Sequence, residues 1–235
     1  MEYTVHRLLA MIKTTKDRIE RELYNEENSV SWVRVARGQE ENISGVSIKE
    51  IKRDIQSHYD KVIALIDNYV KLKSAVLRSN AGIRPDAEVF KTKVAGKSLT
   101  VAEIIDLQNM VYGRTNRTGF KSRLLEKMKE DYAEAQEEFD NMQEKADAEI
   151  KQYINSIVGR KKDNDETDSS TKSVIEATSK MLHEQKDPCL VDPLKITEKI
   201  RTLENEIENF LTEADSVLSE QNALTKIELD LVEVK

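Results

Sequence analysis

A cationic segment flanked by glycines is the part of the sequence best suited to ligand chemistry. It runs from Gly113 to Arg123 and reads GRTNRTGFKSR. The glycines let the backbone approach a ligand closely, and a helix that begins near Thr118 offers free backbone amides to an anion. Arginine guanidinium groups bind phosphate or carboxylate oxygens through two parallel hydrogen bonds. The segment therefore suits a phosphate-bearing small molecule such as a nucleotide, with Arg114, Asn116, Arg117, Lys121 and Arg123 as candidate contacts.

Two other interpretations of this segment stay open. A solvated turn between helices, with its arginines paired to nearby glutamates, explains the same composition, and contact with RNA is a third reading. The spacing does not form a Walker A loop, because no Gly-x-x-x-x-Gly-Lys-Ser/Thr occurs and Gly96-Lys97-Ser98 lacks the upstream glycine. ATP hydrolysis is therefore not expected.

Two asparagine motifs each mark the end of an expected long helix. Asn80 is followed by Arg84, and Asn222 is followed by Thr225. One interpretation is a left-handed helix cap at each asparagine, and the other is that the amides hydrogen-bond a ligand or a neighbouring subunit. On the second interpretation, the candidate ligand-binding residues of the chain are Asn80, Arg84, Arg114, Asn116, Arg117, Lys121, Arg123, Asn222 and Thr225.

Residue types that serve catalysis are few and scattered. The chain holds three histidines and one cysteine. We expect His6 and His183 to face solvent, His58 to pack on the apolar side of its helix, and Cys189 to be packed and inert. A Cys/His zinc site is not expected from so few ligands. The sequence thus predicts no catalytic residue, no metal site and no cofactor.

The composition predicts long helices. The chain has 235 residues but only 7 Gly and 3 Pro, too few for the many turns of a β-sandwich or an α/β fold, while 34% of its residues are charged. A net charge of −7 argues against nucleic-acid binding by the surface as a whole. No apolar run of about 18 residues and no signal-peptide pattern occur, so we expect a cytoplasmic location, in the host if the chain is phage-encoded.

The first half of the chain contains three helical patterns, one β-rich connection and one loop-like connection. Apolar residues three and four apart predict a helix from Tyr3 to Leu23. Capping boxes at Ser47–Glu50 and Thr100–Glu103 predict the starts of two further helices. The helix that starts after Ser47 is expected to end near Gly82. Residues 29–38 form a short strand or an extended arm, whose Trp32 either closes the local core or is buried on another subunit. Residues 84–97 are expected to form a loop or a small hairpin.

The second half is dominated by one long pattern. An apolar period of about 3.5 to 3.6 from Phe120 to Ile157 predicts a coiled-coil arm or a bundle helix. The polar residues 159–172 form its tip, and a helix over 174–183 folds back. A last long helix begins with Asp192 as cap and Pro193 at the first helical position. The alternating residues 225–231 then predict a closing strand.

These elements predict a mainly α fold, an antiparallel bundle of long helices with a projecting coiled-coil hairpin and a few short β-strands. The expected parts are a helical core (1–125), the hairpin (126–185), and a C-terminal helix and strand that complete the core (186–235). Long apolar stripes are poorly covered within one chain of this size, so we expect a homo-oligomer.

Three stretches resemble a family of small bacterial and phage helical proteins, some of which are labelled septicolysin-like. They are residues 66–81, 96–105 and 218–229. They match a helix that ends in an asparagine-containing turn, a Gly-x-x-Leu-Thr helix start, and a closing helix that ends in Asn-x-x-Thr before a strand. The resemblance covers residues 1–125 and about 186–231, and the hairpin between them is absent from shorter relatives. It implies no established activity.

We therefore expect a non-enzymatic, oligomeric protein that binds a small anionic, nucleotide-like ligand at its subunit boundaries. In a phage, such a protein would sequester a nucleotide signal of host immunity as an anti-defence sponge. The alternative is a structural or protein–protein interaction module that acts through the hairpin. An enzyme ranks third, because it requires several carboxylates that converge on a metal. The expected partners are the chain itself and the small molecule, rather than a membrane or a nucleic acid.

Overall fold

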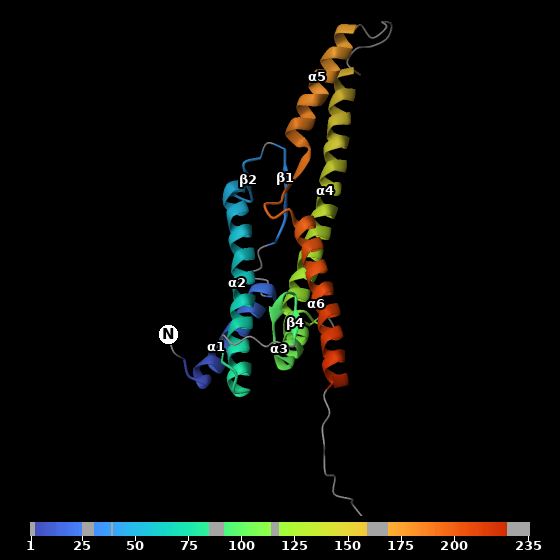
Figure 1. Cartoon of the computed structure of the whole chain (residues 1–235). Helices are drawn as coiled ribbons and strands as arrows, with labels where there is room; N and C mark the ends of the chain where they lie inside the picture. The colour runs from blue at the N-terminus through green and yellow to red at the C-terminus, as the bar shows by residue number, and fades with distance from the viewer. Residues whose placement is uncertain are drawn as a thin grey trace, which may run out of the picture. The chain divides into compact units, whose positions relative to one another are not determined.

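The computed structural model describes residues 3–24, 31–38, 40–84, 92–113, 118–158 and 169–224. These residues form a mainly α fold, as the sequence predicted, together with one π-helix and short antiparallel strand pairs (Figure 1). The helices are α1 (Val5–Tyr24), α2 (Ile48–Asn80), α3 (Val101–Asp106), the π-helix η1 (Leu107–Val111), α4 (Phe120–Val158), α5 (Ser169–Lys186) and α6 (Ile196–Leu224). The strands are β1 (Arg34–Arg37), β2 (Asn42–Ile43), β3 (Val46–Ser47), β4 (Lys93–Val94), β5 (Lys97–Ser98) and β6 (Pro188–Val191).

Helix α2 is capped at both ends by residues close to it in sequence. The Ser47 hydroxyl accepts a hydrogen bond from the Lys49 backbone amide at 3.3 Å, which satisfies one donor of the first turn. At the other end, Gly82 adopts a left-handed φ of 68°, and Ile83 donates its backbone amide to the Arg78 carbonyl at 2.9 Å. This is a Schellman cap. The left-handed residue is thus Gly82, whereas Asn80 is itself helical.

Two tight hairpins each lead into a helix. Strands β2 and β3 are joined by Ser44 and Gly45, with φ of 50° and 83°, and strands β4 and β5 by Ala95 and Gly96, with φ of 50° and 73°. Positive φ at both central residues is the geometry of a type I′ turn, whose twist suits a two-residue hairpin. The first hairpin precedes α2 and the second precedes α3. The hairpin expected within residues 84–97 is confirmed for β4 and β5.

The chain divides into two compact units that are not contiguous in sequence. The cavity unit comprises Met1–Ser29, Lys61–Glu126 and Ile200–Lys235, and the hairpin unit comprises Val30–Asp60 and Lys127–Lys199. Helices α2, α4 and α6 each contribute residues to both units. This division differs from the predicted one because residues 30–60 belong with the long hairpin.

Contacts of β1 and Trp32 explain why residues 30–60 belong to the hairpin unit. Strand β1 pairs antiparallel with β6, with Val35 opposite Leu190. The Trp32 backbone amide donates to Asp131 Oδ2 of α4 at 2.8 Å, and its indole ring lies 4.8 Å from the His58 ring. Trp32 is 1% exposed, so it closes the local core of this chain. His58 packs against it as predicted.

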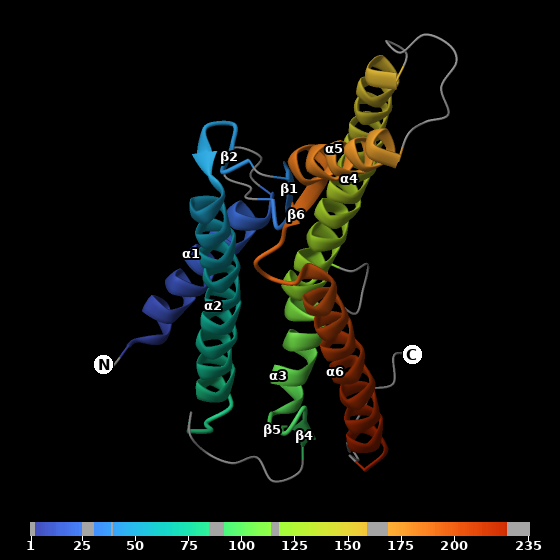
Figure 2. The same ribbon diagram turned by 90° about the horizontal axis from the view of Figure 1, so that it is seen from above.

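Within the cavity unit, α3 lies between α2 and α6 in both views (Figures 1 and 2). Tyr112, at the end of η1, stacks on Phe210 of α6 with ring centroids 3.9 Å apart. Gln108 of η1, buried, donates to Asp215 of α6 at 2.8 Å. A side chain at Gly119 would meet the Gly113 backbone nitrogen at 2.3 Å, so this approach requires glycine. These contacts hold η1, and with it α3, beside α6.

Two expectations for the stretch before α6 are wrong. The helix begins at Ile196 rather than at Pro193, because Lys195 holds a φ of 52°, which the first turn of a helix cannot contain. Asp192 still accepts the Ile196 backbone amide at 2.8 Å. Cys189 is exposed on β6 instead of packed.

Two further predictions fall on residues outside the described part of the chain. One is the hairpin tip, apart from residues 169–172 of α5, and the other is the closing strand at residues 225–231.

Candidate functional site

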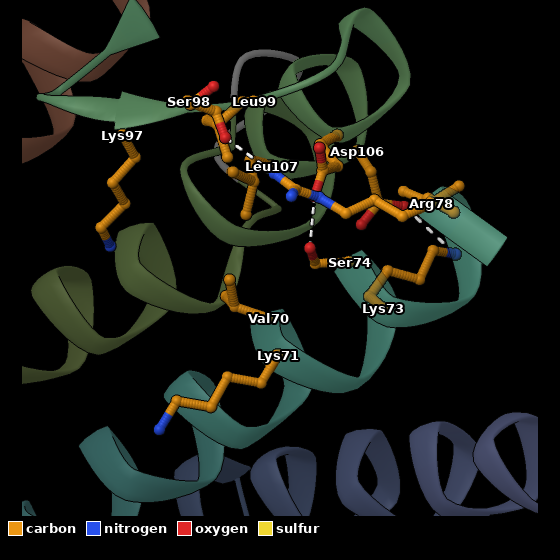
Figure 3. A pocket seen from close by; sticks show the side chains of 12 residues that line it. Val70, Lys71, Lys73, Ser74, Arg78, Lys97, Ser98, Leu99, Asp106 and Leu107 are labelled. Carbon is orange, nitrogen blue, oxygen red and sulfur yellow. Dashed lines mark hydrogen bonds and ion pairs between the residues drawn. The ribbon is translucent and has the colours of Figure 1, made fainter. Parts of the chain in front are cut away.

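A cavity of about 290 Å³ lies in the cavity unit between the last turns of α2, strand β5 and helix α3 (Figure 3). Four of its twelve lining residues are apolar, six are charged and two are serines. The apolar side chains come from α2, from the residue that follows β5 and from the start of η1, and they are Val70, Leu77, Leu99 and Leu107. The charged side chains are Lys71, Lys73, Arg78, Lys97, Glu103 and Asp106.

A buried ion pair forms one wall of this cavity. Glu103 Oε1 accepts hydrogen bonds from Arg78 Nε at 2.8 Å and from the Ser74 hydroxyl. The other oxygen, Oε2, accepts the Thr100 backbone amide at 2.7 Å, which completes the predicted capping box of α3. Arg78 Nη2 also donates to the Ser98 carbonyl at 2.7 Å. The pair therefore ties α2, β5 and α3 together.

The Glu103 carboxylate is held in its charged form. Burial by itself raises the pKa of Glu103, but hydrogen bonds from Arg78, Ser74 and Thr100 outweigh burial, so the net pKa lies below its usual value. Only 2% of Glu103 and 7% of Arg78 is exposed. The Arg78 guanidinium is consequently engaged by Glu103 and the Ser98 carbonyl, and we do not expect it to bind an anionic ligand.

The lysines of the cavity are less constrained. Lys73 Nζ lies 3.2 Å from Asp106 Oδ1 and is neutralised by it. Lys71 and Lys97 are exposed and form no ion pair within the part of the chain that the structure describes. In Figure 3 both side chains lie away from the Lys73–Asp106 pair. Four basic and two acidic side chains leave the lining with a formal charge of +2, in a chain whose net charge is −7.

This arrangement suits binding more than bond-making chemistry. Among the described residues that line the cavity there is no histidine or cysteine to act as nucleophile or base, and the Ser74 hydroxyl donates a hydrogen bond to the Glu103 carboxylate. The cavity adjoins η1, and π-helical turns are often found at functional sites. Its four apolar side chains, together with the Lys71 and Lys97 ammonium groups, which have no carboxylate partner among the described residues, can hold an anion that also has an apolar part.

The described residues of the predicted cationic segment do not converge on one ligand. Lys121 forms an ion pair with Glu206 of α6 and lies over the Tyr112 ring. Arg123 lies over the Tyr24 ring and 3.9 Å from Glu20 of α1. These two cations point to different helices and are paired with glutamates, as in the solvated-turn interpretation.

The other predicted site residues are dispersed or not described. Asn80 and Arg84 are exposed at the end of α2, and Asn222 is exposed in the last turn of α6. Arg114, Asn116, Arg117 and Thr225 lie outside the described residues. None of the described candidates lines the cavity.

The cavity residues were not predicted from the sequence, although their spacing carries a signal for them. Lys71, Ser74 and Arg78 are spaced by three and four, so they share one face of α2 beside the apolar stripe. The capping box at Thr100 identified Glu103 as well, but only as a helix start. A polar face on an otherwise amphipathic helix, close to a second helix start, is the pattern that predicts such a wall.

Comparison of the chain with models of protein families, with curated proteins and with solved structures gives no match. The resemblance to the septicolysin-like proteins therefore stays a prediction. No helix among the described residues carries an apolar stretch long enough to cross a membrane.

Proposed function

We propose that the chain is a non-enzymatic binding protein for a small amphipathic anion, held in the cavity between α2, β5 and α3. The observation that supports this proposal is the formal charge of +2 among the residues that line the cavity, next to four apolar side chains. Lys71 and Lys97 supply two ammonium groups without carboxylate partners among the described residues. An anionic group placed between them replaces water with two charge-assisted hydrogen bonds.

The buried pair has a supporting role in this proposal. Arg78 and Glu103 neutralise each other and hold β5 against α2, which keeps Lys97 facing the cavity. The ligand therefore meets a preformed wall and does not have to order it, which lowers the entropic cost of binding.

The size of the cavity limits the ligand. About 290 Å³ is at the lower end of the range of roughly 300–1,000 Å³ that is typical of small-molecule pockets. One ring system with one phosphate or carboxylate fits this description better than a dinucleotide. A nucleoside monophosphate is the nucleotide-like member of this class, and a protein that binds it without converting it would act by sequestration.

Isothermal titration calorimetry of the full chain with adenosine monophosphate tests the proposal. Inorganic phosphate serves as a probe of the ligand's anionic group without an apolar part, and a medium-chain fatty acid as a probe in which an alkyl chain replaces the ring system. We expect adenosine monophosphate to bind more tightly than phosphate, and its affinity to fall as salt rises. If none of these probes binds, the proposal is wrong.

Paired variants locate the site. Lys97→Gln and Lys71→Gln each remove one charge-assisted hydrogen bond, worth about 1.5–3 kcal/mol, so each should weaken binding by at least about tenfold. Lys93→Gln is the matched control, because Lys93 is exposed on the same hairpin but does not line the cavity. An equal loss in Lys93→Gln and Lys97→Gln would show general charge attraction instead of a site.

We also retain self-association through the hairpin unit as a second candidate function. Val174 and Met181 are 57% and 50% exposed and lie seven residues apart, on one face of α5. A second copy of the chain would cover this face. Sedimentation velocity should show a concentration-dependent oligomer that Val174→Ser with Met181→Ser shifts toward monomer, and a wild-type protein that is monomeric at all concentrations contradicts this.

A further inference from the structure

Four polar side chains gather where α4 faces the end of α5 in the hairpin unit. Asp147, His183 and Asp187 each offer a ligand atom, and these atoms all lie within 4.8 Å of one another. The His183 Nδ1 atom lies 3.0 Å from Asp187 Oδ1. Gln143 Nε2 donates both to Asp147 Oδ1 at 3.0 Å and to Asp187 Oδ1 at 3.3 Å. One amide group thus bridges two carboxylates.

The spacing of these residues is that of a metal site built on two helices. Gln143 and Asp147 are four residues apart on α4, whereas His183 lies in the last turn of α5 and Asp187 is the first residue after that helix ends at Lys186. Residues at i and i+4 project from the same helical face, which is how paired ligands on one helix hold a metal ion. Ligands about 2.0–2.2 Å from a Zn²⁺ ion lie roughly 3–4 Å from one another. The His183–Asp187 separation of 3.0 Å falls in this range, and the outer limit of 4.8 Å for the cluster means that its widest pair would have to draw closer around an ion.

We propose that Asp147, His183 and Asp187 bind a first-row divalent cation, with Gln143 as the fourth ligand. Rotation of the Gln143 amide by half a turn about its last side-chain bond brings Oε1 to the position of Nε2, so the present hydrogen-bond donor becomes a ligand. One imidazole nitrogen and three oxygens suit Zn²⁺ or Mn²⁺, whereas Mg²⁺ and Ca²⁺ prefer oxygen ligands alone. The two carboxylates supply the charge that neutralises the ion.

The surroundings favour an accessible ion over a closed structural one. A cavity of about 280 Å³ adjoins the cluster and is lined by Asp147 and His183, together with the polar residues Asn155 and Ser179. The side chains of His183 and Asp187 are 41% and 38% exposed. Water or a small anion can therefore complete the coordination shell. This site lies in the hairpin unit and is independent of the anion-binding cavity proposed above.

The simpler interpretation is a hydrogen-bond network that fixes the α4–α5 pair. Lys186 and Glu149 already form such a link nearby at 2.7 Å, and His183 near the end of α5 is favourably placed for the helix dipole. The two interpretations differ in one measurable respect, because only a metal site loses cation binding when a single ligand is replaced.

The test is isothermal titration of the full chain with Zn²⁺ after treatment with a chelator. Mn²⁺ and Mg²⁺ are titrated in parallel, and Co²⁺ is added as a spectroscopic probe whose visible absorption reports nitrogen and oxygen coordination. We expect one equivalent of Zn²⁺ to bind, and His183→Ala and Asp147→Asn to abolish binding. Gln143→Leu should weaken it by about tenfold or more.

The chain supplies a close control on the same helix. Gln136 and Asp140 form the same kind of amide–carboxylate hydrogen bond, at 3.1 Å, one helical stretch earlier on α4. Among the described residues, this pair is not part of a group that includes a histidine and could hold a metal ion. Asp140→Asn should leave Zn²⁺ binding unchanged, as should His6→Ala on α1. Wild-type protein that takes up no Zn²⁺, or binding that survives both His183→Ala and Asp147→Asn, would overturn the proposal. Circular dichroism of each variant confirms that it remains folded.

Discussion

The two hairpin-to-helix junctions of the chain have nearly the same local construction but different surroundings. In the hairpin unit, β2 and β3 lead through Ser47 into α2, and Glu50 three residues on is exposed. In the cavity unit, β4 and β5 lead to Thr100 and α3, and Glu103 three residues on is only 2% exposed. The second carboxylate faces Arg78, whereas the first faces solvent.

This difference separates what a local motif determines from what its neighbours determine. Turn geometry and capping start a helix in either place, because they involve only adjacent residues. Burial against α2 turns the second glutamate into one half of an ion pair that forms a cavity wall. The same residue type at the same position in a motif can therefore be a minor helix contact or a structural necessity.

The largest effect is expected from separating the buried pair. Arg78→Met leaves Glu103 charged and buried without its partner, which should lower the free energy of unfolding by about 3–5 kcal/mol. Urea unfolding followed by far-ultraviolet circular dichroism measures this change. Glu50→Gln at the exposed junction is the control and should have little effect. The double variant Arg78→Met with Glu103→Leu should recover part of the loss, and if it recovers none, the pair is not what stabilises the wall.

Acid should reproduce part of this loss in the wild-type protein. A carboxyl group whose pKa is lower in the folded chain stabilises the fold above its unfolded pKa, and this contribution is lost as pH falls through the folded pKa. The ordinary value for Glu103 is 4.5, so stability should fall progressively below about pH 4.5. Urea unfolding at a series of pH values tests this, and the double variant should show a shallower acid dependence. Equal slopes would assign the acid loss to other carboxylates.

The two turn glycines should respond alike, because their geometry is set locally. Gly45→Ala and Gly96→Ala each place a side chain on a residue with φ of 83° or 73°, with open space around it. The left-handed conformation costs a non-glycine residue about 1–2 kcal/mol. Both variants should thus lose similar stability in urea unfolding. A much larger loss for Gly96→Ala would mean that the hairpin beside the cavity is strained by its neighbours.

The smallest difference is expected at the capping hydroxyls. Thr100→Ala removes the acceptor for the Glu103 amide at 3.2 Å, which is the Thr100 half of a complete capping box, at a cost of about 1 kcal/mol. Ser47→Ala removes a single bond of 3.3 Å to Lys49 and should cost less. Thr100→Ser and Ser47→Thr serve as retained-cap controls. A larger loss for Ser47→Ala than for Thr100→Ala would contradict the expectation that the complete capping box is the stronger cap.

The local features of the fold could be predicted from the sequence. The Thr100 cap, the Gly82 stop of α2 and the long helix α4 all depend on residues within a few positions of each other, where helical periodicity and capping preferences decide the outcome. The Arg78–Glu103 pair, the pairing of β1 with β6 and the cluster around His183 join residues that are far apart in sequence. Their formation depends on packing, which periodicity does not encode. The start of α6 shows a third case, since the left-handed Lys195 overrides a good sequence signal at Pro193.

The division of α2, α4 and α6 between the two units has a genetic consequence. Each of these helices begins in one unit and ends in the other, so neither unit corresponds to an unbroken stretch of coding sequence. A single recombination breakpoint therefore cannot exchange one whole unit while sparing the other. The cluster around His183 lies entirely within the segment 127–199, however, and the cavity residues lie between 70 and 107, so the exchange of that one segment would replace the cluster and leave the cavity residues unchanged.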